Sequence, residues 1–129
     1  MPRIVGTGID LCEVRRIEQA IGRSGRLFLD RVFTPAEIEY AERAPAARFQ
    51  RYAARFAAKE AGMKAIGTGW QRGVGFRDFE VTNDAAGKPS LNLSGNAAQI
   101  AAGLGASRIH LSLTHTNSTG MASVILEAE

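Results

Sequence analysis

The chain has 129 residues, 45% of them hydrophobic, and carries 16 basic and 13 acidic side chains, for a net charge of +3. This length predicts one domain, and the hydrophobic content excludes an intrinsically disordered chain. So small a basic excess does not predict a nucleic-acid partner, and no apolar stretch is long enough to cross a bilayer. The lone Cys12 excludes an intrachain disulfide and zinc sites built from cysteine clusters. We therefore expect a cytoplasmic protein, since the N-terminus also lacks the apolar run of a signal peptide.

The first half of the chain predicts one strand followed by helices. Residues 3–11 predict the strand, and an amphipathic helix is expected to follow as far as Ile21, with Leu11 in its buried stripe. In "TPAEIE", Thr34 precedes a proline at the first helical position and a glutamate three residues later, which together predict the start of a short helix. Apolar residues at helical spacing then predict the longest helix over residues 46–66, ended by a glycine.

The second half of the chain predicts a hairpin, a helix and two further strands. Gly87 supplies the backbone freedom for the hairpin turn. The expected elements are strands at 76–84 and 89–93, a helix at 94–105, and strands at 107–115 and 121–129. Strands and helices do not alternate regularly, which favours an α+β domain with an antiparallel sheet.

Glu60 interrupts an apolar stripe of the longest predicted helix. The other members of the stripe are Phe49, Ala53, Phe56, Met63 and Gly67. A pair between Glu60 and Lys64, four residues later, would stabilise a helix by ~0.2–0.5 kcal/mol, but such pairs suit an exposed face. Ionising a carboxylate on a buried face costs several kcal/mol unless a partner or a metal is present. The pattern therefore leaves two interpretations open, a helix-stabilising pair and a functional site.

Asp10 also allows two interpretations. With Glu13 three residues later, it resembles a capping box at the start of the first predicted helix. Alternatively, Gly6 and Gly8 leave its face of the strand open, so that a phosphate or a metal could approach. Together, Asp10 and Glu60 would supply the one or two carboxylates that Mg²⁺ typically takes from a protein.

His115 and the arginines of the first helix are further candidates. His115 lies where the strand at 107–115 ends, and it is either a hydrogen-bonded structural histidine or a site residue. Five arginines between Arg15 and Arg31 accompany only two acidic residues. This arginine-rich stretch is either a solvated helix face or a surface for an acidic partner. No glycine motif completes a dinucleotide fingerprint or a Walker loop.

Four stretches together resemble the holo-acyl carrier protein synthase family, the small bacterial 4'-phosphopantetheinyl transferases. In chain order they are "GTGIDLCEVRRIE", "RFAAKEAGMKAIGTG", "NDAAGKP" and "HLSLTHTNS". The likeness covers essentially the whole chain, and the second stretch is the most specific. It implies a 4'-phosphopantetheinyl transferase fold, in which an antiparallel sheet packs against a long central helix in a single domain of residues 1–129. It also implies a homotrimer with active sites between neighbouring subunits.

The resemblance further implies an activity and its residues. The phosphopantetheine arm of coenzyme A would pass to a serine of apo-acyl carrier protein, with Mg²⁺ as cofactor and adenosine 3',5'-bisphosphate as product. Asp10 and Glu60 match the metal ligands, Glu60 and Lys64 match the catalytic residues, and the base for the serine stays open between Glu60 and a metal-bound water. The matches to coenzyme A-binding segments are Arg55, Lys64, Gly87, Lys88, Pro89, His115 and Thr116, and those to the carrier-binding surface are Arg16, Arg23 and Arg26.

The chain departs from the family pattern at a few positions. Thr119 and Gly120 stand where alanines are common, which is expected to change the packing of the last strands. Ala20 lies on the carrier-facing helix at a position where a larger apolar residue can occur in the family, which is expected to change the affinity for a carrier or the choice of carrier. A rival hypothesis is a non-catalytic module that binds an acidic protein or RNA through its arginine-rich first helix. That hypothesis leaves Glu60 unexplained.

Overall fold

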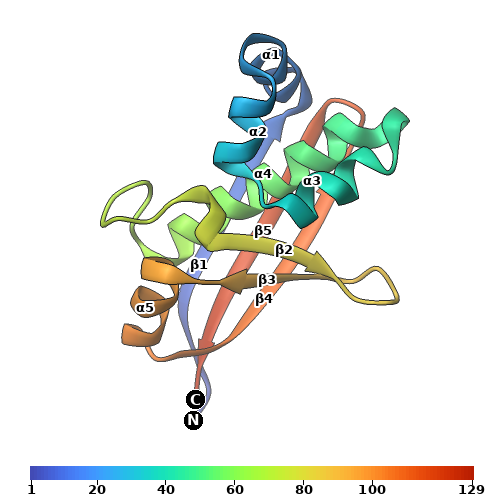
Figure 1. Ribbon diagram of the computed structural model, residues 1–129. Helices are drawn as coiled ribbons and strands as arrows, with labels where there is room; N and C mark the ends of the chain where they lie inside the picture. Colours follow the sequence, from blue (N-terminus) through green and yellow to red (C-terminus); the bar gives the residue numbers. More distant parts are fainter.

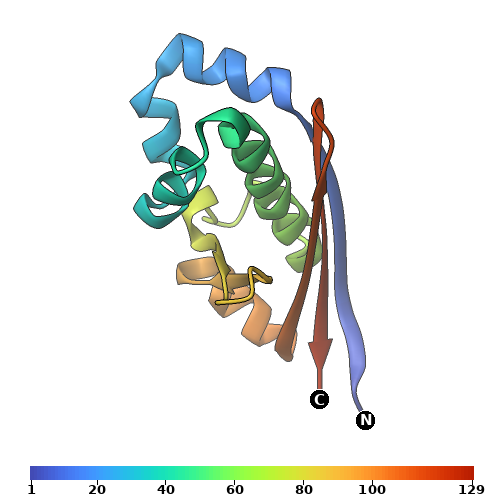
Figure 2. The ribbon, with the colours of Figure 1, turned by 90° about the vertical axis from the view of Figure 1, so that its right-hand side faces the viewer.

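The protein is a three-stranded antiparallel sheet with every helix on one side of it, as the computed structural model of residues 1–129 shows (Figures 1 and 2). The long helix α4 lies against this sheet, and α3 and a separate two-stranded hairpin lie on the far side of α4. The elements in chain order are β1 (Arg3–Glu13), α1 (Val14–Ser24), α2 (Arg26–Val32), α3 (Pro35–Glu42), α4 (Arg48–Ile66), β2 (Phe79–Asn83), β3 (Pro89–Leu93), α5 (Gly95–Gly103), β4 (Ala106–His115) and β5 (Thr119–Ala128). The expected α+β architecture is confirmed.

The main sheet has the order β1-β5-β4, so that the C-terminal strand lies between the other two. Asp10 on β1 pairs with Ala122, which in turn pairs with Leu113 on β4. The strand β1 continues to Glu13, two residues beyond the predicted end, because its ladder with β5 runs on that far. The prediction that Leu11 belongs to the buried stripe of the first helix is therefore wrong, and its side chain is 54% exposed on the sheet.

Glycines of β1 let α4 approach the sheet closely. A Cβ atom on Gly8 would lie 1.9 Å from the Ala61 carbonyl oxygen, and one on Gly6 would lie 2.1 Å from the Ala65 carbonyl oxygen. The helix backbone thus occupies the face that these glycines leave bare, so the expectation that they clear a path for a phosphate or a metal is wrong. Gly120 on β5 has the same function, since its Cβ would lie 2.6 Å from the backbone nitrogen of Ala54.

A buried ion pair ties α4 to α3 and to the hairpin. Lys59 Nζ lies 2.7 Å from Glu37 Oε1, neither side chain is exposed, and Lys59 also donates to the carbonyl oxygens of residues 76 and 79. Glu37 accepts hydrogen bonds from the backbone nitrogens of Thr34 and Val81. The first of these bonds belongs to the predicted capping box of α3, which is confirmed. Every polar atom of the pair is satisfied, which makes burial of the two charges tolerable.

The predicted elements differ from the observed ones in a few places. Helix α2 was not expected, and its seven residues are too few for a clear periodic pattern. The strand expected at 76–84 is shorter, because Phe76–Asp78 form a 3-10 turn. The turn residue Gly87 has the expected positive φ, 89°.

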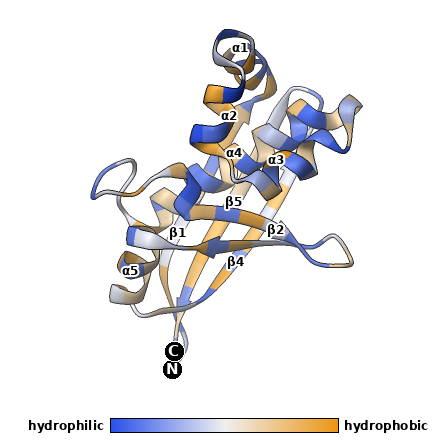
Figure 3. Cartoon of the chain, viewed as in Figure 1, coloured by the Kyte–Doolittle hydropathy of each residue, from blue (hydrophilic) through white to orange (hydrophobic).

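The outer face of the main sheet is covered by nothing (Figure 2). Ile9 and Leu11 on β1 are more than half exposed there, and Met121 and Ile125 on β5 are half-buried beside them. Figure 3 shows hydrophobic stretches along β4 and β5, with hydrophilic stretches on α1, α2 and α3. None of the helices combines the length and the apolar character that crossing a membrane requires.

Candidate active site

Two carboxyl groups meet where β1 contacts α4. Asp10 comes from the strand and Glu60 from the middle of the helix, and the two influence each other. Burial and the adjacent Asp10 carboxyl together raise the pKa of Glu60 to about 7, against the lowering effect of Arg16 and Lys64. The apolar stripe predicted around Glu60 is largely buried, as expected. Ionising both members of such a pair at and above neutral pH lowers stability, so the arrangement favours a functional site.

Lys64 pairs with Asp10. Its Nζ donates to Asp10 Oδ1 and to the Ile9 carbonyl oxygen, each over 3.0 Å, while the side chain remains 54% exposed. The structural alternative of a Glu60–Lys64 helix pair is not what the structure contains. The capping interpretation of Asp10 is also wrong, because α1 begins only at Val14 and its N-cap makes no side-chain hydrogen bond.

The two carboxylates suit a hard divalent cation that brings other ligands with it. No group of three or more His, Cys, Asp or Glu side chains gathers anywhere in the molecule, so ligands of other kinds would have to complete the coordination of an ion at Asp10 and Glu60. Mg²⁺ typically binds one or two carboxylates and completes its coordination with waters and substrate phosphates. Asp10 and Glu60 fit that pattern in number and in ligand type.

A cavity of about 330 Å³ lies on the other side of α4, between α3, the hairpin turn and the end of β4. Four of the residues expected to bind coenzyme A line it, whereas Lys88 and Thr116 are only adjacent in sequence to lining residues. The lining residues are Tyr40, Ala47, Arg51, Ala54, Arg55, Asn83, Gly87, Pro89, Leu113, Thr114 and His115. None of them is acidic, so the cavity is positively charged.

Arg55 is the most constrained side chain of this cavity. It is only 3% exposed, its Nη2 donates to Asn83 Oδ1, and its guanidinium lies 3.9 Å from the centroid of the Tyr40 ring. Burial lowers the pKa of Arg55, and its buried Nε has no hydrogen-bond partner. Unsatisfied buried donors are rare in proteins and call for an explanation, which an anionic ligand at this cavity would supply.

The residues predicted for one site fall into two groups on the same helix. Arg55 and Glu60 are five residues apart, so their side chains project about 140° apart around α4. Asp10, Glu60 and Lys64 lie on the β1 side, whereas Arg55 and His115 lie on the β4 side. One copy of the chain therefore does not bring all the predicted residues together.

The arginines of the first helices differ in whether an acidic side chain already pairs with them. Arg16 and Arg23 line a small cavity of about 180 Å³ beside Ala20, where α1 meets α2 and α4. Arg16 also acts on the charge of Glu60, so this surface adjoins the carboxylates. Arg26 is held in an exposed ion pair with Asp30, at 2.9 Å. Of the three arginines expected to bind a carrier, Arg26 is the one already paired.

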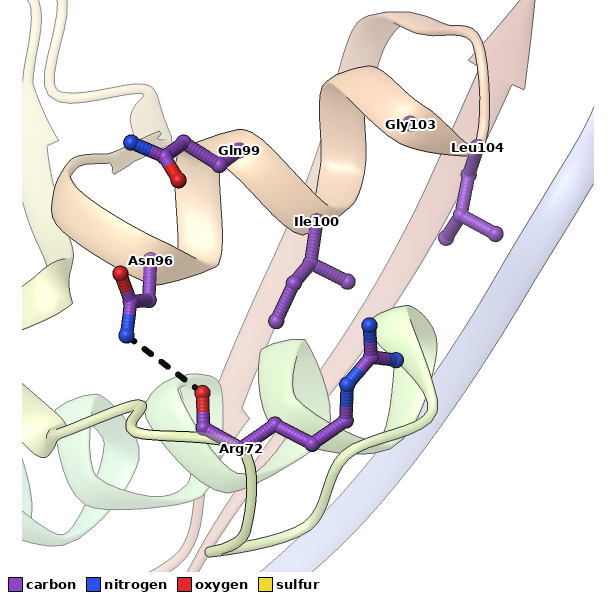
Figure 4. Close-up of a pocket in the computed structure, with 6 residues that line it drawn as sticks. All are labelled: Arg72, Asn96, Gln99, Ile100, Gly103 and Leu104. Atoms are coloured by element: carbon purple, nitrogen blue, oxygen red, sulfur yellow. Dashed lines mark hydrogen bonds between the residues drawn. The ribbon is translucent and has the colours of Figure 1, made fainter.

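A larger cavity, of about 510 Å³, lies away from both groups (Figure 4). It is formed by α5 and the loop before the hairpin, where the Asn96 side chain donates to the carbonyl oxygens of Arg72 and Gly73. It contains none of the predicted site residues and no carboxylate. Its size therefore does not make it the site, because the ionisable groups with altered pKa values lie elsewhere.

Comparisons with known proteins decide the family. A family model described as the 4'-phosphopantetheinyl transferase superfamily matches residues 6–116. A holo-[acyl-carrier-protein] synthase of Solibacter usitatus is 61% identical over 96% of this chain and 98% of its own. A holo-(acyl-carrier-protein) synthase from Bacillus anthracis, solved in complex with CoA (3',5'-ADP), has a TM-score of 0.80 at 38% identity and covers 98% of both chains. The holo-[acyl-carrier-protein] synthase of Neisseria meningitidis has a TM-score of 0.85 at 35% identity, over 96% of this chain and 98% of that one.

The chain belongs to the 4'-phosphopantetheinyl transferase superfamily. The expected family and the expected enzyme class are thereby confirmed. The sequence pattern did not predict three residues of this transferase that surround the cavity of Arg55. They are Tyr40, Arg51 and Asn83. They come from α3, α4 and β2, and only the tertiary fold brings them together.

Proposed function

We propose that this transferase moves the 4'-phosphopantetheine group of coenzyme A to a serine of apo-acyl carrier protein and releases adenosine 3',5'-bisphosphate. The observation that carries the proposal is α4, which presents a carboxylate pair on one side and a buried guanidinium in a cationic cavity on the other. Relatives that span nearly the whole chain are named as synthases of holo-acyl carrier protein, and one neighbour was solved with CoA. Residues 1–129 would act as one domain in the cytoplasm.

Asp10 and Glu60 would hold Mg²⁺ beside the reacting pyrophosphate. The bound ion would offset the negative charge that develops during phosphoryl transfer. The ligand oxygens would come from β1 and α4, two closely packed elements, which would hold the two carboxylates in position. Lys64 is about half exposed, and its side chain would turn from Asp10 to the departing bisphosphate. The proton of the serine would leave to Glu60 or to water at the same site.

Residues of the second group would bind the nucleotide end of coenzyme A. Arg55 and His115 line the cationic cavity, Gly87 and Pro89 form its rim in the hairpin turn, and Lys88 and Thr116 follow these segments. A cavity of about 330 Å³ lies within the usual range of small-molecule sites, roughly 300–1,000 Å³.

The active enzyme would be a homotrimer. The carboxylate pair and the cationic cavity lie on different sides of α4, so a neighbouring subunit is needed to place one group opposite the other. The outer sheet face supplies an apolar surface for that contact, around Ile9 and Leu11. Arg16, whose charge acts on Glu60, and Arg23, which lines the same small cavity, would receive the acidic carrier protein.

The proposal is tested by mass spectrometry of the carrier. The protein is incubated with coenzyme A, Mg²⁺ and several apo-acyl carrier proteins, and each carrier is weighed. We expect a gain of one phosphopantetheine in at least one carrier, abolished by EDTA. No mass gain in any carrier would overturn the proposal and leave the rival hypothesis, a module that binds acidic proteins or RNA.

A further inference from the structure

Arg51 shares the cationic cavity with Arg55 and is absent from the residues that the sequence predicted. It lies one turn before Arg55 on α4, is half-buried, and lines the cavity directly. Its Nη1 donates to the Tyr40 carbonyl oxygen at 2.6 Å, and its guanidinium lies 4.1 Å from the centroid of the Tyr40 ring. Tyr40 therefore fixes both guanidinium groups at the same cavity.

The carboxylates near this cavity are already engaged elsewhere. Glu42 pairs with Arg48, and Glu39 pairs with Arg43, each on the surface of the molecule. Glu37 is buried against Lys59. No ion pair satisfies Arg51 or Arg55, so two guanidinium charges face one cavity without a protein anion. Such a cavity is complementary to a dianion.

Coenzyme A offers phosphate groups in two places. The pyrophosphate contains the reacting phosphorus, and in the proposed function it lies at Asp10 and Glu60. The other phosphate is the monoester at the 3' position of the ribose, on the nucleotide end of the molecule. Because Asp10 and Glu60 take the pyrophosphate in the proposed function, the cationic cavity, whose lining contains neither carboxylate, would receive the 3'-phosphate.

We propose that Arg51 binds the 3'-phosphate of coenzyme A together with Arg55, and that it makes this enzyme discriminate against 3'-dephospho-coenzyme A. The assignment rests on the proposed function. Arg51 uses one nitrogen on the Tyr40 carbonyl and stacks on the ring, which leaves Nη2 and Nε available to the phosphate. A guanidinium held in this way loses little conformational freedom on binding.

The test compares ligands that differ only in the 3'-phosphate. Binding of adenosine 3',5'-bisphosphate and of 5'-AMP is measured by titration calorimetry for the wild type, Arg51→Met, Arg51→Lys and the control Arg43→Met. Arg43 is an exposed surface arginine outside both groups. We expect Arg51→Met to weaken the bisphosphate about 10- to 100-fold, which is the contribution of a charged hydrogen bond, and to leave 5'-AMP within about 2-fold. Arg51→Lys should recover part of the loss, and Arg43→Met should change neither ligand.

Steady-state kinetics provide the second measurement. Arg51→Met should raise KM for coenzyme A with little change in kcat, and should leave the kinetics with 3'-dephospho-coenzyme A unchanged. Equal losses with both substrates, or no loss with either, would overturn the assignment to the 3'-phosphate. A wild type that transfers nothing from coenzyme A would instead overturn the proposed function. Thermal unfolding of each variant separates these outcomes from misfolding.

Discussion

Lys64 bridges from α4 to the Asp10 carboxylate on β1, over 3.0 Å, although Glu60 precedes it by one turn of its own helix. Asp10 thus has a cationic partner and Glu60 has none. Burial and the neighbouring Asp10 then raise the pKa of Glu60 to about 7. The helix-stabilising pair between Glu60 and Lys64 that the four-residue spacing allowed is therefore absent. Lys64 instead connects α4 to β1, and the Glu60 carboxyl is left without an ion pair.

Glu60→Gln should abolish transfer and stabilise the protein at alkaline pH. A carboxyl whose pKa rises from 4.5 to about 7 on folding contributes fully below pH 4.5, and its contribution is lost as the pH rises through 7. Glutamine does not ionise, so the variant escapes that loss. In EDTA at pH 8 we expect a gain of about 1–2 kcal/mol, discounted for the partial exposure of Glu60, and no difference near pH 4.5.

Urea unfolding across this pH range checks the gain in stability, and the carrier mass assay checks the loss of transfer. An active Glu60→Gln enzyme would remove Glu60 from the metal ligands. A variant that unfolds at every pH would instead assign Glu60 a structural function.

Lys59 and Lys64 stand in the same motif, and the same substitution should separate their functions. Lys59→Met leaves Glu37 charged and buried without a cationic partner, which should cost about 3–5 kcal/mol of stability. Lys64 is exposed, so Lys64→Met should keep the stability and slow transfer on the order of 100-fold. Urea midpoints and transfer rates of the two variants give the comparison. A stable Lys59→Met protein would contradict the importance of the buried pair.

The sequence predicted elements better than it predicted contacts. The capping box at Thr34 and the end of α4 at its glycine depend on neighbouring residues, and the structure confirms both. Lys59 is buried by α3 and β2, which are remote from it in sequence. No local sequence pattern could therefore predict its burial. Gly6 and Gly8 were interpreted as an open surface because an absent side chain looks the same whether a ligand or a helix fills the space.

In the candidate site too, the sequence predicted the residues but not their placement in the fold. Residue type and motif sufficed to single out Asp10, Glu60 and Arg55. The placement of Arg55 on the far side of α4 from Glu60 needed the packing of the helix between two layers. Tyr40 and Arg51 carry no sequence signal of their own, since an arginine on a tyrosine ring is visible only after α3 and α4 are brought together.

The close approach of β1 to α4 can be tested at Gly8. Gly8→Ala places a methyl group 1.9 Å from the Ala61 carbonyl oxygen, which belongs to a rigid helix backbone, so we expect a loss of at least about 3 kcal/mol. Gly22 lies in α1 with nothing within 4 Å of its Cβ position. Gly22→Ala should therefore stabilise the protein by about 0.5–1 kcal/mol. Chemical denaturation of both variants is the measurement, and equal effects would refute the packing argument.

Replacing each arginine of the first helices by glutamate should show how much each one contributes to carrier binding. Arg16→Glu and Arg23→Glu should each raise KM for the carrier about 10-fold or more, with KM for coenzyme A unchanged, because both line the small cavity where α1 meets α2 and α4. Arg26→Glu should have a smaller effect, since Arg26 already pairs with Asp30. Steady-state kinetics with each substrate varied in turn distinguish the cases. Equal losses for carrier and coenzyme A would count against a carrier surface.

Mixed trimers test whether the active site lies between subunits. Glu60→Gln lacks a complete carboxylate pair but keeps the cationic cavity. Arg55→Met keeps the carboxylate pair but has a defective cavity. Each variant should be inactive or nearly so by itself. When the two chains are co-expressed, random assembly places an intact carboxylate pair opposite an intact cavity at about a quarter of the interfaces. Activity should return to about that fraction of the wild type.

The matched control combines Glu60→Gln with Asp10→Asn, two defects in the same group of residues. This mixture should stay inactive, because no interface then contains a complete carboxylate pair. Leu11→Asp on the outer sheet face should prevent assembly, and light scattering should then show monomers without activity. Recovery in neither mixture, with trimers present by light scattering, would place the complete site within one subunit. That result would require a large movement of α4, because the helix itself separates Arg55 from Glu60.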